Sequence, residues 1–389
     1  MFVAFLKLGL TSFGGPIAHL GYFRDELVLR RRWLDDAAYA ELVALCQFLP
    51  GPASSQVGFA LGLWRAGPLG ALAAWAAFTL PSAIALVLFA MAAGALEGPV
   101  VQGVLQGLKL VAVAVVAQAV WGMARSLTPD RQRASIAVAA IAAIVLLPGA
   151  IGQILAIGLG VVAGLLLCRD LPLPPAAAVH FPVSRRTGVI ALGLFTLLLV
   201  GLPLLASVSD SHGLELFAGF FRAGALVFGG GHVVLPLLEA ETVATGWLSP
   251  EVFIAGYGAT QAVPGPLFTF AAYLGAAGTP SPNGLLGAAI ALLAIFLPGL
   301  LLLIGTLPFW NSLRSRPLAQ AGMRGANAAV VGILGAALYN PVFTSAVLSP
   351  LDFALAAGGF VLLVVWKAPP WVVVVMLATT GGILGMLGG

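Results

Sequence analysis

Long apolar runs separated by short polar stretches cover most of the chain, and two runs in its first half are interrupted by helix-breaking residues. The runs of the first half span residues 2–23, 37–64, 69–95, 101–124, 134–148 and 150–168. Because a helix needs roughly 17–25 apolar residues to cross a bilayer, these runs predict helices that span a membrane or nearly do so. Residues 12–16 interrupt the first run and Pro50, Gly51 and Pro52 the second, where proline removes amide donors and glycine lets the backbone bend.

The same pattern starts again in the second half, after a polar, proline-rich stretch at 169–186 and a lone apolar run at 187–206. Matching motifs lie at an offset of 214 or 215 residues: Phe-Gly-Gly at 13–15 and 228–230, Trp-Leu at 33–34 and 247–248, and the Gln and Pro-Gly-Pro of 47–52 and 261–266. Their order and spacing predict an internal duplication. We therefore divide the chain into a first repeat at 1–168, a linker with one extra span at 169–213, and a second repeat at 214–389.

Basic residues lie in non-corresponding loops of the two repeats, which predicts that the repeats are inverted relative to each other. In the first repeat arginines follow the first and fourth runs, and only the acidic Glu97 lies between the third and fourth. In the second repeat Arg314 and Arg316 lie between the third and fourth runs, while the loops after the first and fourth are acidic. Since Lys and Arg in short loops mark the cytoplasmic side, the second repeat crosses the membrane in the opposite sense.

We expect an all-α polytopic membrane protein built from two inverted-topology repeats with broken or re-entrant helices. If the broken runs are re-entrant hairpins, the charges are consistent with about nine spans plus four hairpins, a cytoplasmic N-terminus and an external C-terminus. If every broken run crosses fully, the chain has up to about 13 segments. Broken helices at corresponding positions of two repeats are typical of transporters, which bind their substrates at the breaks.

Composition excludes a soluble protein. The chain of 389 residues is 60% hydrophobic and 8% charged, with a mean hydropathy of +1.06, whereas soluble proteins carry about 25% charged residues. The lipid bilayer is therefore its environment, and the scattered arginines, at a formal net charge of +4, make no nucleic-acid-binding surface. Cys46 and Cys168 have no metal-ligand spacing, so we expect no metal and no cofactor. The sequence leaves a homodimer open.

Four basic residues lie inside apolar runs at matching positions of the two repeats: Lys7 with Arg222, and Lys109 with Arg324. Charged groups in a membrane are costly and commonly face the interior of the helix bundle, so these four are candidate substrate-binding residues for an anion. The alternative is that their long side chains extend to the membrane surface, which suits Lys7 and Arg222 near the ends of their runs.

The breaks supply a second means of holding an anion. A half-helix that begins after a break directs unpaired backbone N–H groups and the positive end of its dipole toward that break, with hydroxyl and amide side chains in its first turn. A hinge or close helix packing is the alternative. The candidate substrate-binding residues at the breaks are Gly14, Gly15, Gln47, Pro50, Gly51, Pro52, Ser54 and Ser55 in the first repeat, and Gly229, Gly230, Gln261, Pro264, Gly265, Pro266 and Thr269 in the second.

The titratable residues near the breaks do not form the kind of group that an enzyme's active site requires. His19 and His232 follow the Gly-Gly pairs without aligning in the repeats; each could couple protons, although a bond to a backbone carbonyl is the commoner role. Glu41 falls inside a run, whereas we expect Glu26 and Glu241 to be solvated loop charges. The spans hold neither a paired nucleophile and base nor a metal-ligating cluster, and no Walker A motif indicates ATP as the direct driver.

Together these motifs resemble the chromate ion transporter (CHR) family in its long-chain, two-domain form. Residues 13–19, 32–34 and 47–52 are similar to its N-terminal half, and residues 228–236, 246–248 and 261–266 to its C-terminal half. The resemblance implies functional roles for Gly14, Gly15, Pro50, Gly51 and Pro52 and for their second-repeat partners.

The same resemblance implies a multi-pass protein of a bacterial or archaeal inner membrane that exports chromate and so confers chromate resistance. It also implies sulfate, a tetrahedral dianion of similar size, as a competitor or alternative substrate. The residues alone lead only to an anion site at the interface of inverted repeats. The alternative to chromate export is uptake of sulfate or another oxyanion, or a channel-like permease, on the same scaffold.

Overall fold

The computed structural model describes residues 1–95, 98–169, 183–228, 230–314 and 316–388. Glu97, Gly229 and most of the 169–186 linker lie outside these ranges. The regular elements of the described residues are all helical, which confirms the predicted all-α polytopic class. The helices of the first half are α1 (Phe2–Thr11), α2 (Gly15–Phe23) with a π-helical continuation (Arg24–Arg30), α3 (Asp36–Phe48), α4 (Ala53–Ala95), α5 (Pro99–Leu127), α6 (Arg131–Leu146) and α7 (Ala150–Leu167).

The helix α8 (Arg185–Ser207) precedes the second half and is the extra span expected in the linker. The helices of the second half are α9 (His212–Ala225), α10 (Val234–Thr242) after a 3-10 turn (Gly231–Val233), α11 (Pro250–Thr260), α12 (Phe270–Ala277) after a 3-10 turn (Leu267–Thr269), α13 (Gly284–Thr306), α14 (Trp310–Arg314), α15 (Pro317–Ala337), α16 (Thr344–Ala346), α17 (Pro350–Val364) and α18 (Pro370–Gly388). A third 3-10 turn (Leu307–Phe309) precedes α14, and a π-helical turn (Leu338–Phe343) precedes α16.

Seven helices of the described chain are long and apolar enough to cross a membrane: α4, α5, α7, α8, α13, α15 and α18, with their flanking turns. The α6 and α17 helices contain 16 and 15 residues and would complete the count of nine spans. The broken runs are short helices. The count of nine spans with four hairpins, and the inversion of the repeats, remain predictions.

Glycines with positive φ separate the short helices where the sequence predicts breaks. Gly14 (φ 93°) and Gly15 (φ 81°) divide α1 from α2, and Gly51 (φ 119°) divides α3 from α4. In the second half Gly230 (φ 148°) and Gly265 (φ 108°) have the same role. Such backbone conformations are easily reached only without a Cβ atom, so the break positions follow directly from the sequence.

A kink also divides α4 near its first third. Ala66 and Gly67 have non-helical backbone angles, so residues 53–65 form a short half-helix and residues 68–95 a long one. This is the division between the apolar runs 37–64 and 69–95 expected from the sequence. Each of the two broken runs of the first half therefore consists of two short helices: α1 and α2 in the run 2–23, and α3 and the first part of α4 in the run 37–64.

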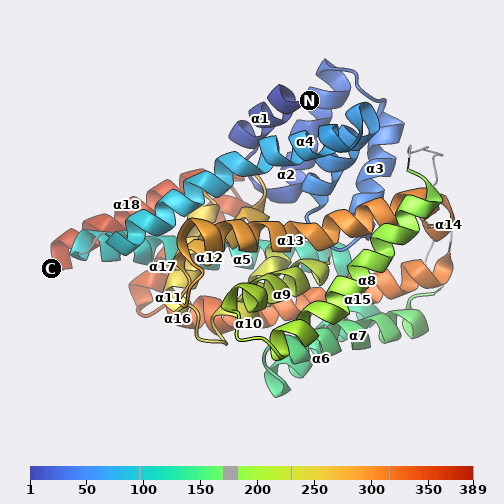
Figure 1. Cartoon of the computed structure of the whole chain (residues 1–389). Coiled ribbons are helices and arrows are strands. Elements are labelled where there is room, and N and C mark those ends of the chain that lie inside the picture. The colour runs from blue at the N-terminus through green and yellow to red at the C-terminus, as the bar shows by residue number, and fades with distance from the viewer. Residues whose placement is uncertain (96–97, 170–182, 229, 315, 389) are drawn as a thin grey trace.

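The two halves of the chain interlock rather than standing apart (Figure 1). In the first half α5 packs against α11, α17 and α18, and in the second half α15 packs against α6 and α7. Glycines permit the closest approaches: Gly103 lies against the Gly381 carbonyl, and Gly160 against Gly325. Small residues at crossing points are what helices need in order to associate within lipid. Packing between the halves thus positions the breaks.

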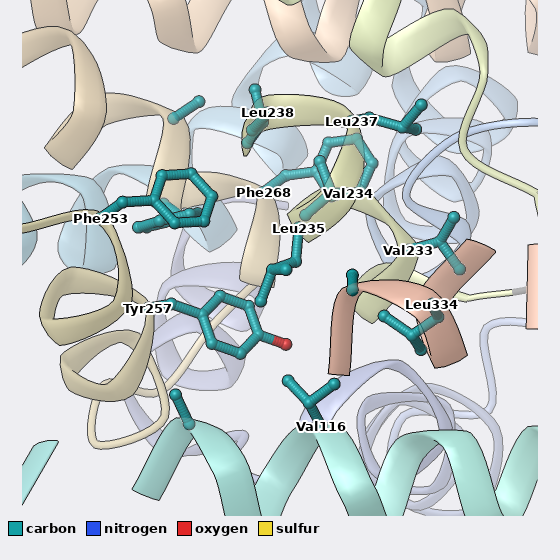
Figure 2. Packing of buried hydrophobic residues seen from close by; sticks show 14 of the residues in the cluster. Val116, Val233, Val234, Leu235, Leu237, Leu238, Phe253, Tyr257, Phe268 and Leu334 are labelled. Carbon is teal, nitrogen blue, oxygen red and sulfur yellow. The ribbon is translucent and has the colours of Figure 1, made fainter. Parts of the chain in front are cut away.

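The largest apolar core includes the side chains of α10, a short helix whose residues are almost all buried. Figure 2 shows its side chains Val234 and Leu235 with Tyr257 of α11 and Val116 of α5, all fully buried or nearly so. In contrast α8 buries only 11% of its most apolar window, as expected for a helix that faces lipid. The core therefore keeps the second-half breaks away from lipid.

Candidate functional site

Two backbone hydrogen bonds join the four breaks at the interface of the halves. The Gly51 N–H donates to the Val227 carbonyl at 2.8 Å, and the Gly265 N–H donates to the Ser12 carbonyl at 2.9 Å. Each bond links the Pro-Gly-Pro of one half to the glycine break of the other. Because the two bonds occupy corresponding positions in the sequence, the breaks form one shared centre.

Close packing on two proline-containing helices holds this centre in place. A Cβ atom on Gly51 would lie 3.0 Å from the Cα of Gly299 in α13, and one on Gly265 would lie 2.7 Å from Ser82 Oγ in α4. Gly299 and Ser82 each follow a proline within their helix. A larger residue would therefore require a shift of the α13 backbone or the Gln56 side chain at Gly51 and of the Ser82 side chain at Gly265, and its backbone would be strained at a positive φ.

Polar side chains from the first half line the centre. His19 Nδ1 in α2 lies 3.3 Å from Ser54 Oγ in the first turn of α4. Gln56, also in that turn, donates through Nε2 to the Pro50 carbonyl at 3.0 Å and to the Gly299 carbonyl at 2.9 Å. The first turn of α4 is thus tied to its own break and to the other half of the protein.

Several of these buried polar atoms have no hydrogen-bond partner in the part of the chain that the structure describes. We define the central polar cluster as Ser12, His19, Ser55, Gln56 and Thr79. It contributes five of the seven unpartnered buried side-chain atoms of the described residues: Ser12 Oγ, His19 Nε2, Ser55 Oγ, Gln56 Oε1 and Thr79 Oγ1. Leaving a buried polar group without a partner costs about 1–3 kcal/mol, so their concentration here indicates a site made for something other than stability.

A histidine of the second half faces the start of α2. His232 Nδ1 lies 2.7 Å from Tyr257 Oη, and its Nε2 would lie 3.7 Å from a Cβ atom placed on Gly15. The N-cap of α2 is Gly14, which offers no side-chain acceptor to the first-turn N–H groups. No side chain at the N-cap therefore occupies the first-turn N–H groups of α2, and such free N–H groups at a helix start are what anions bind.

Corresponding ion pairs flank the centre in the two halves. Lys7 Nζ lies 2.6 Å from Glu26 Oε2, and Arg222 forms two bonds to Glu241 at 2.6 and 2.8 Å. Both carboxylates are buried, at 6% exposure of the side chain. The expectation that Glu26 and Glu241 are solvated loop charges is therefore wrong, because the chain folds back after each glycine break and brings them onto the preceding helix. Lys7 and Arg222 are engaged with these carboxylates.

The other two matched cations make contacts away from the breaks. Arg324 donates through Nη1 to the carbonyl of Cys168, at the C-terminal end of α7. Lys109 is half-buried, and the charges it interacts with are Glu251 and Asp352 in the first turns of α11 and α17. None of these contacts involves a break residue.

The remaining predicted residues differ between the halves. Gln47 is exposed, whereas Gln261 is buried, with Nε2 at 3.5 Å from the Tyr257 carbonyl. The Thr269 hydroxyl, which corresponds to that of Ser55, donates to the Pro266 carbonyl at 2.7 Å. At this pair of corresponding positions the hydroxyl is thus satisfied in the second half and unpartnered in the described part of the first.

Ser12 and Thr79 are absent from the candidates drawn from the sequence, whereas the amide of Gln56 is among the side chains expected in the first turn after Pro52. Ser12 directly precedes the Phe-Gly-Gly motif, and Thr79 lies two residues before Pro81 within an apolar helix. A polar residue beside a helix-breaking residue in an apolar run was the signal that could have identified them. As for metals, the described residues contain no group of three or more His, Cys, Asp or Glu side chains suited to hold an ion. What the centre offers is a set of hydroxyl, amide and imidazole groups, which can form hydrogen bonds.

Comparison with known proteins finds one family. A family model described as chromate transporter matches residues 1–165 and 214–385. The chain is 28% identical over 406 residues to a chromate transport protein of Pseudomonas aeruginosa, covering 100% of this chain and 91% of that protein. It is 29% identical to a probable chromate transport protein of Synechococcus elongatus, covering 86% and 82%, and 27% identical to a chromate transport protein of Cupriavidus metallidurans, covering 86% and 80%. No solved structure matches.

Proposed function

The chain belongs to the chromate transporter family, and from this premise we propose that it is a secondary transporter that carries chromate across a membrane. The observation that carries the proposal is the pair of hydrogen bonds from Gly51 to Val227 and from Gly265 to Ser12. They bring four helix breaks and a set of buried donors to one place. Breaks at such an interface are where transporters hold their substrates.

We propose that chromate binds where these breaks meet. Gly14 and Gly15 begin α2, while Ser54 and Ser55 lie in the first turn of α4. The positive ends of both helices and their hydroxyl groups suit the oxygens of a tetrahedral anion. The Pro-Gly-Pro segments at 50–52 and 264–266 shape this site through their backbone.

The four matched cations then have supporting roles. In this proposal the Lys7–Glu26 and Arg222–Glu241 pairs hold the half-helices in place, one pair toward each face of the membrane if the repeats are inverted. Lys109 and Arg324 lie on corresponding helices and add positive potential that favours an anion over a cation.

We further propose that transport is outward, across the inner membrane of a bacterium or archaeon, and that it confers chromate resistance. In a cell that is negative inside, the membrane potential favours export of an anion by about 2.3 kcal/mol per charge for each 100 mV. A dianion gains twice this amount. Potential alone would therefore drive export, and the protein would need no cofactor and perform no enzymatic reaction.

Sulfate is the second candidate substrate, because it is a tetrahedral dianion as chromate is and would meet the same donors. An uptake path or channel-like permease for sulfate would use the same site. A homodimer is compatible with this mechanism, in which each chain carries a complete set of breaks.

Counterflow in proteoliposomes tests the proposal. Vesicles that contain the purified protein and unlabelled chromate should accumulate labelled chromate, and an imposed potential should change the rate for this charged substrate. Unlabelled sulfate should compete. Accumulation of labelled sulfate that unlabelled chromate leaves unaffected would overturn the proposal in favour of a sulfate permease.

A further inference from the structure

We propose that the protein holds one oxyanion at a time, at a site whose unpartnered side-chain donors all come from the first half, although the two halves repeat each other. The donors are Ser12 Oγ, His19 Nε2, Ser55 Oγ and Thr79 Oγ1. This inference rests on the proposed transport of chromate and specifies its binding site.

The donors are buried and lack partners in the described part of the chain. The exposed fraction is 0% for Ser12, 1% for His19, 1% for Ser55 and 0% for Thr79. Hydroxyl groups within helices usually satisfy themselves on a carbonyl of their own helix, as Thr242 does on Leu238 at 2.7 Å. The buried hydroxyls of Ser12, Ser55 and Thr79 do not do so and are available to a ligand. His19 Nε2 is available as a donor in the tautomer in which Nδ1 accepts the hydrogen bond of the Ser54 hydroxyl.

Contacts between neighbouring residues connect these donors to one another. The Ser12 carbonyl receives the Gly265 N–H, and Gly265 packs on Ser82, whose hydroxyl bonds to the Thr79 carbonyl at 3.0 Å. His19 lies edge-on against Phe78, the residue before Thr79, and bonds through Nδ1 to Ser54, the residue before Ser55. The donors therefore belong to one centre, at the C-terminal end of α1, on α2 and on the two parts of α4.

The corresponding positions of the second half cannot form a second site. Ser12 and His19 correspond to Val227 and Val234 at the repeat offset, and Thr79 corresponds to Phe296 when Pro81 is aligned with Pro298. These three apolar side chains are each at most 1% exposed. Thr269, at the position of Ser55, has its hydroxyl bonded to Pro266. Figure 2 shows Val234 and Phe268, the counterpart of Ser54, within the apolar core.

Neutral donors of this kind recognise the shared chemistry of chromate and sulfate. Each hydroxyl or imidazole N–H donates one hydrogen bond to an oxygen, and the uncapped start of α2 adds backbone N–H groups and a favourable dipole. Gln56 Oε1 is an acceptor and does not belong to the donor set. Chloride carries half the charge of these dianions and lacks their tetrahedral arrangement of four acceptor oxygens, so donors spread around the site should favour chromate and sulfate over chloride.

Equilibrium binding to the full-length protein in detergent tests the inference, with radiolabelled chromate as probe and sulfate and chloride as competitors. We expect one chromate per chain, displaced by sulfate and not by chloride at equal concentration. Ser12→Ala, His19→Ala and Ser55→Ala should each weaken chromate binding at least tenfold. Thr242→Ala, which removes a buried hydroxyl bonded within its own helix, should leave the affinity within twofold.

Conservative variants distinguish the loss of a donor from the loss of the folded structure. Ser55→Thr and Thr79→Ser keep a hydroxyl at the site, so their affinity for chromate should stay within about threefold of that of the unmodified protein. Thr79→Val removes the hydroxyl, so its affinity should fall by more than this. Two chromates per chain, or unchanged affinity in Ser55→Ala and Thr79→Val proteins that elute as single species, would overturn the inference while leaving chromate transport intact. A wild-type protein that neither binds nor transports chromate would instead overturn the proposed function, and this inference with it.

Discussion

The backbone N–H of Gly51 donates to the carbonyl of Val227 across the interface of the two halves, at 2.8 Å. The two residues are far apart in the sequence, and the bond has its counterpart in that from Gly265 to Ser12. Since each glycine belongs to a Pro-Gly-Pro and each acceptor to a glycine break, one half completes the backbone hydrogen bonding of the other. Unsatisfied backbone groups are costly within a membrane, so this exchange stabilises both breaks.

Substitution of the Pro-Gly-Pro glycines should abolish transport. Gly51→Ala and Gly265→Ala place a Cβ atom at a φ of 119° or 108° and against Gly299 or Ser82. We expect at least a tenfold loss of chromate counterflow in each variant. Gly122→Ala in α5 is the matched control, because a Cβ atom there meets nothing within 4 Å. Its transport should equal that of the wild type; equal loss in all three variants would contradict a special role for the breaks.

Removal of one partner from a buried ion pair should destabilise the protein. Glu241→Gln leaves Arg222 without its carboxylate, and loss of a partner from a buried pair costs about 3–5 kcal/mol. Thermal unfolding followed by intrinsic fluorescence should show a clearly lowered Tm, and the exchange of both residues, Arg222→Glu with Glu241→Arg, should recover part of it.

An exposed ion pair serves as control for this measurement. Arg24 and Asp36 are 47% and 57% exposed, so Asp36→Asn should change the Tm little. A Tm for Glu241→Gln as high as that for Asp36→Asn would mean that the Arg222–Glu241 pair contributes nothing to stability.

Helix packing between the halves should depend on single glycines. Gly325 in α15 lies against the Gly160 carbonyl and Gly164 of α7, so Gly325→Val should overpack this crossing and cost about 1–3 kcal/mol or more. Size-exclusion chromatography should show a reduced fraction of monodisperse protein. Gly158→Val, on the same α7 helix but with open space at its Cβ, should behave as the wild type does. A uniform effect of both variants would point to helix propensity instead of packing.

Membrane orientation tests the predicted inversion. A reporter fused near Glu97 should lie outside the cell and one near Arg131 in the cytoplasm; in the second half, one near Arg316 should be cytoplasmic and one near Asp352 external. Accessibility of introduced cysteines to an impermeant reagent in intact cells would measure this. A cytoplasmic location for the Glu97 reporter would exclude the proposed topology.

The sequence by itself determined the class of the protein, the positions of its helix breaks and its family resemblance. These properties are local or repetitive. Apolar runs of sufficient length imply membrane helices, proline and glycine end a helix wherever they occur, and the motifs repeat at a fixed offset.

Only the tertiary structure decided which breaks meet and which polar groups are left unpartnered. From the sequence we expect Glu26 and Glu241 to be solvated, because no local pattern reveals that the chain folds back and brings them into contact with Lys7 and Arg222. Likewise Ser55 and Thr269 occupy corresponding positions, yet only Thr269 has its hydroxyl satisfied. Contacts between distant residues depend on how helices pack, and packing is a property of the whole chain rather than of any segment of it.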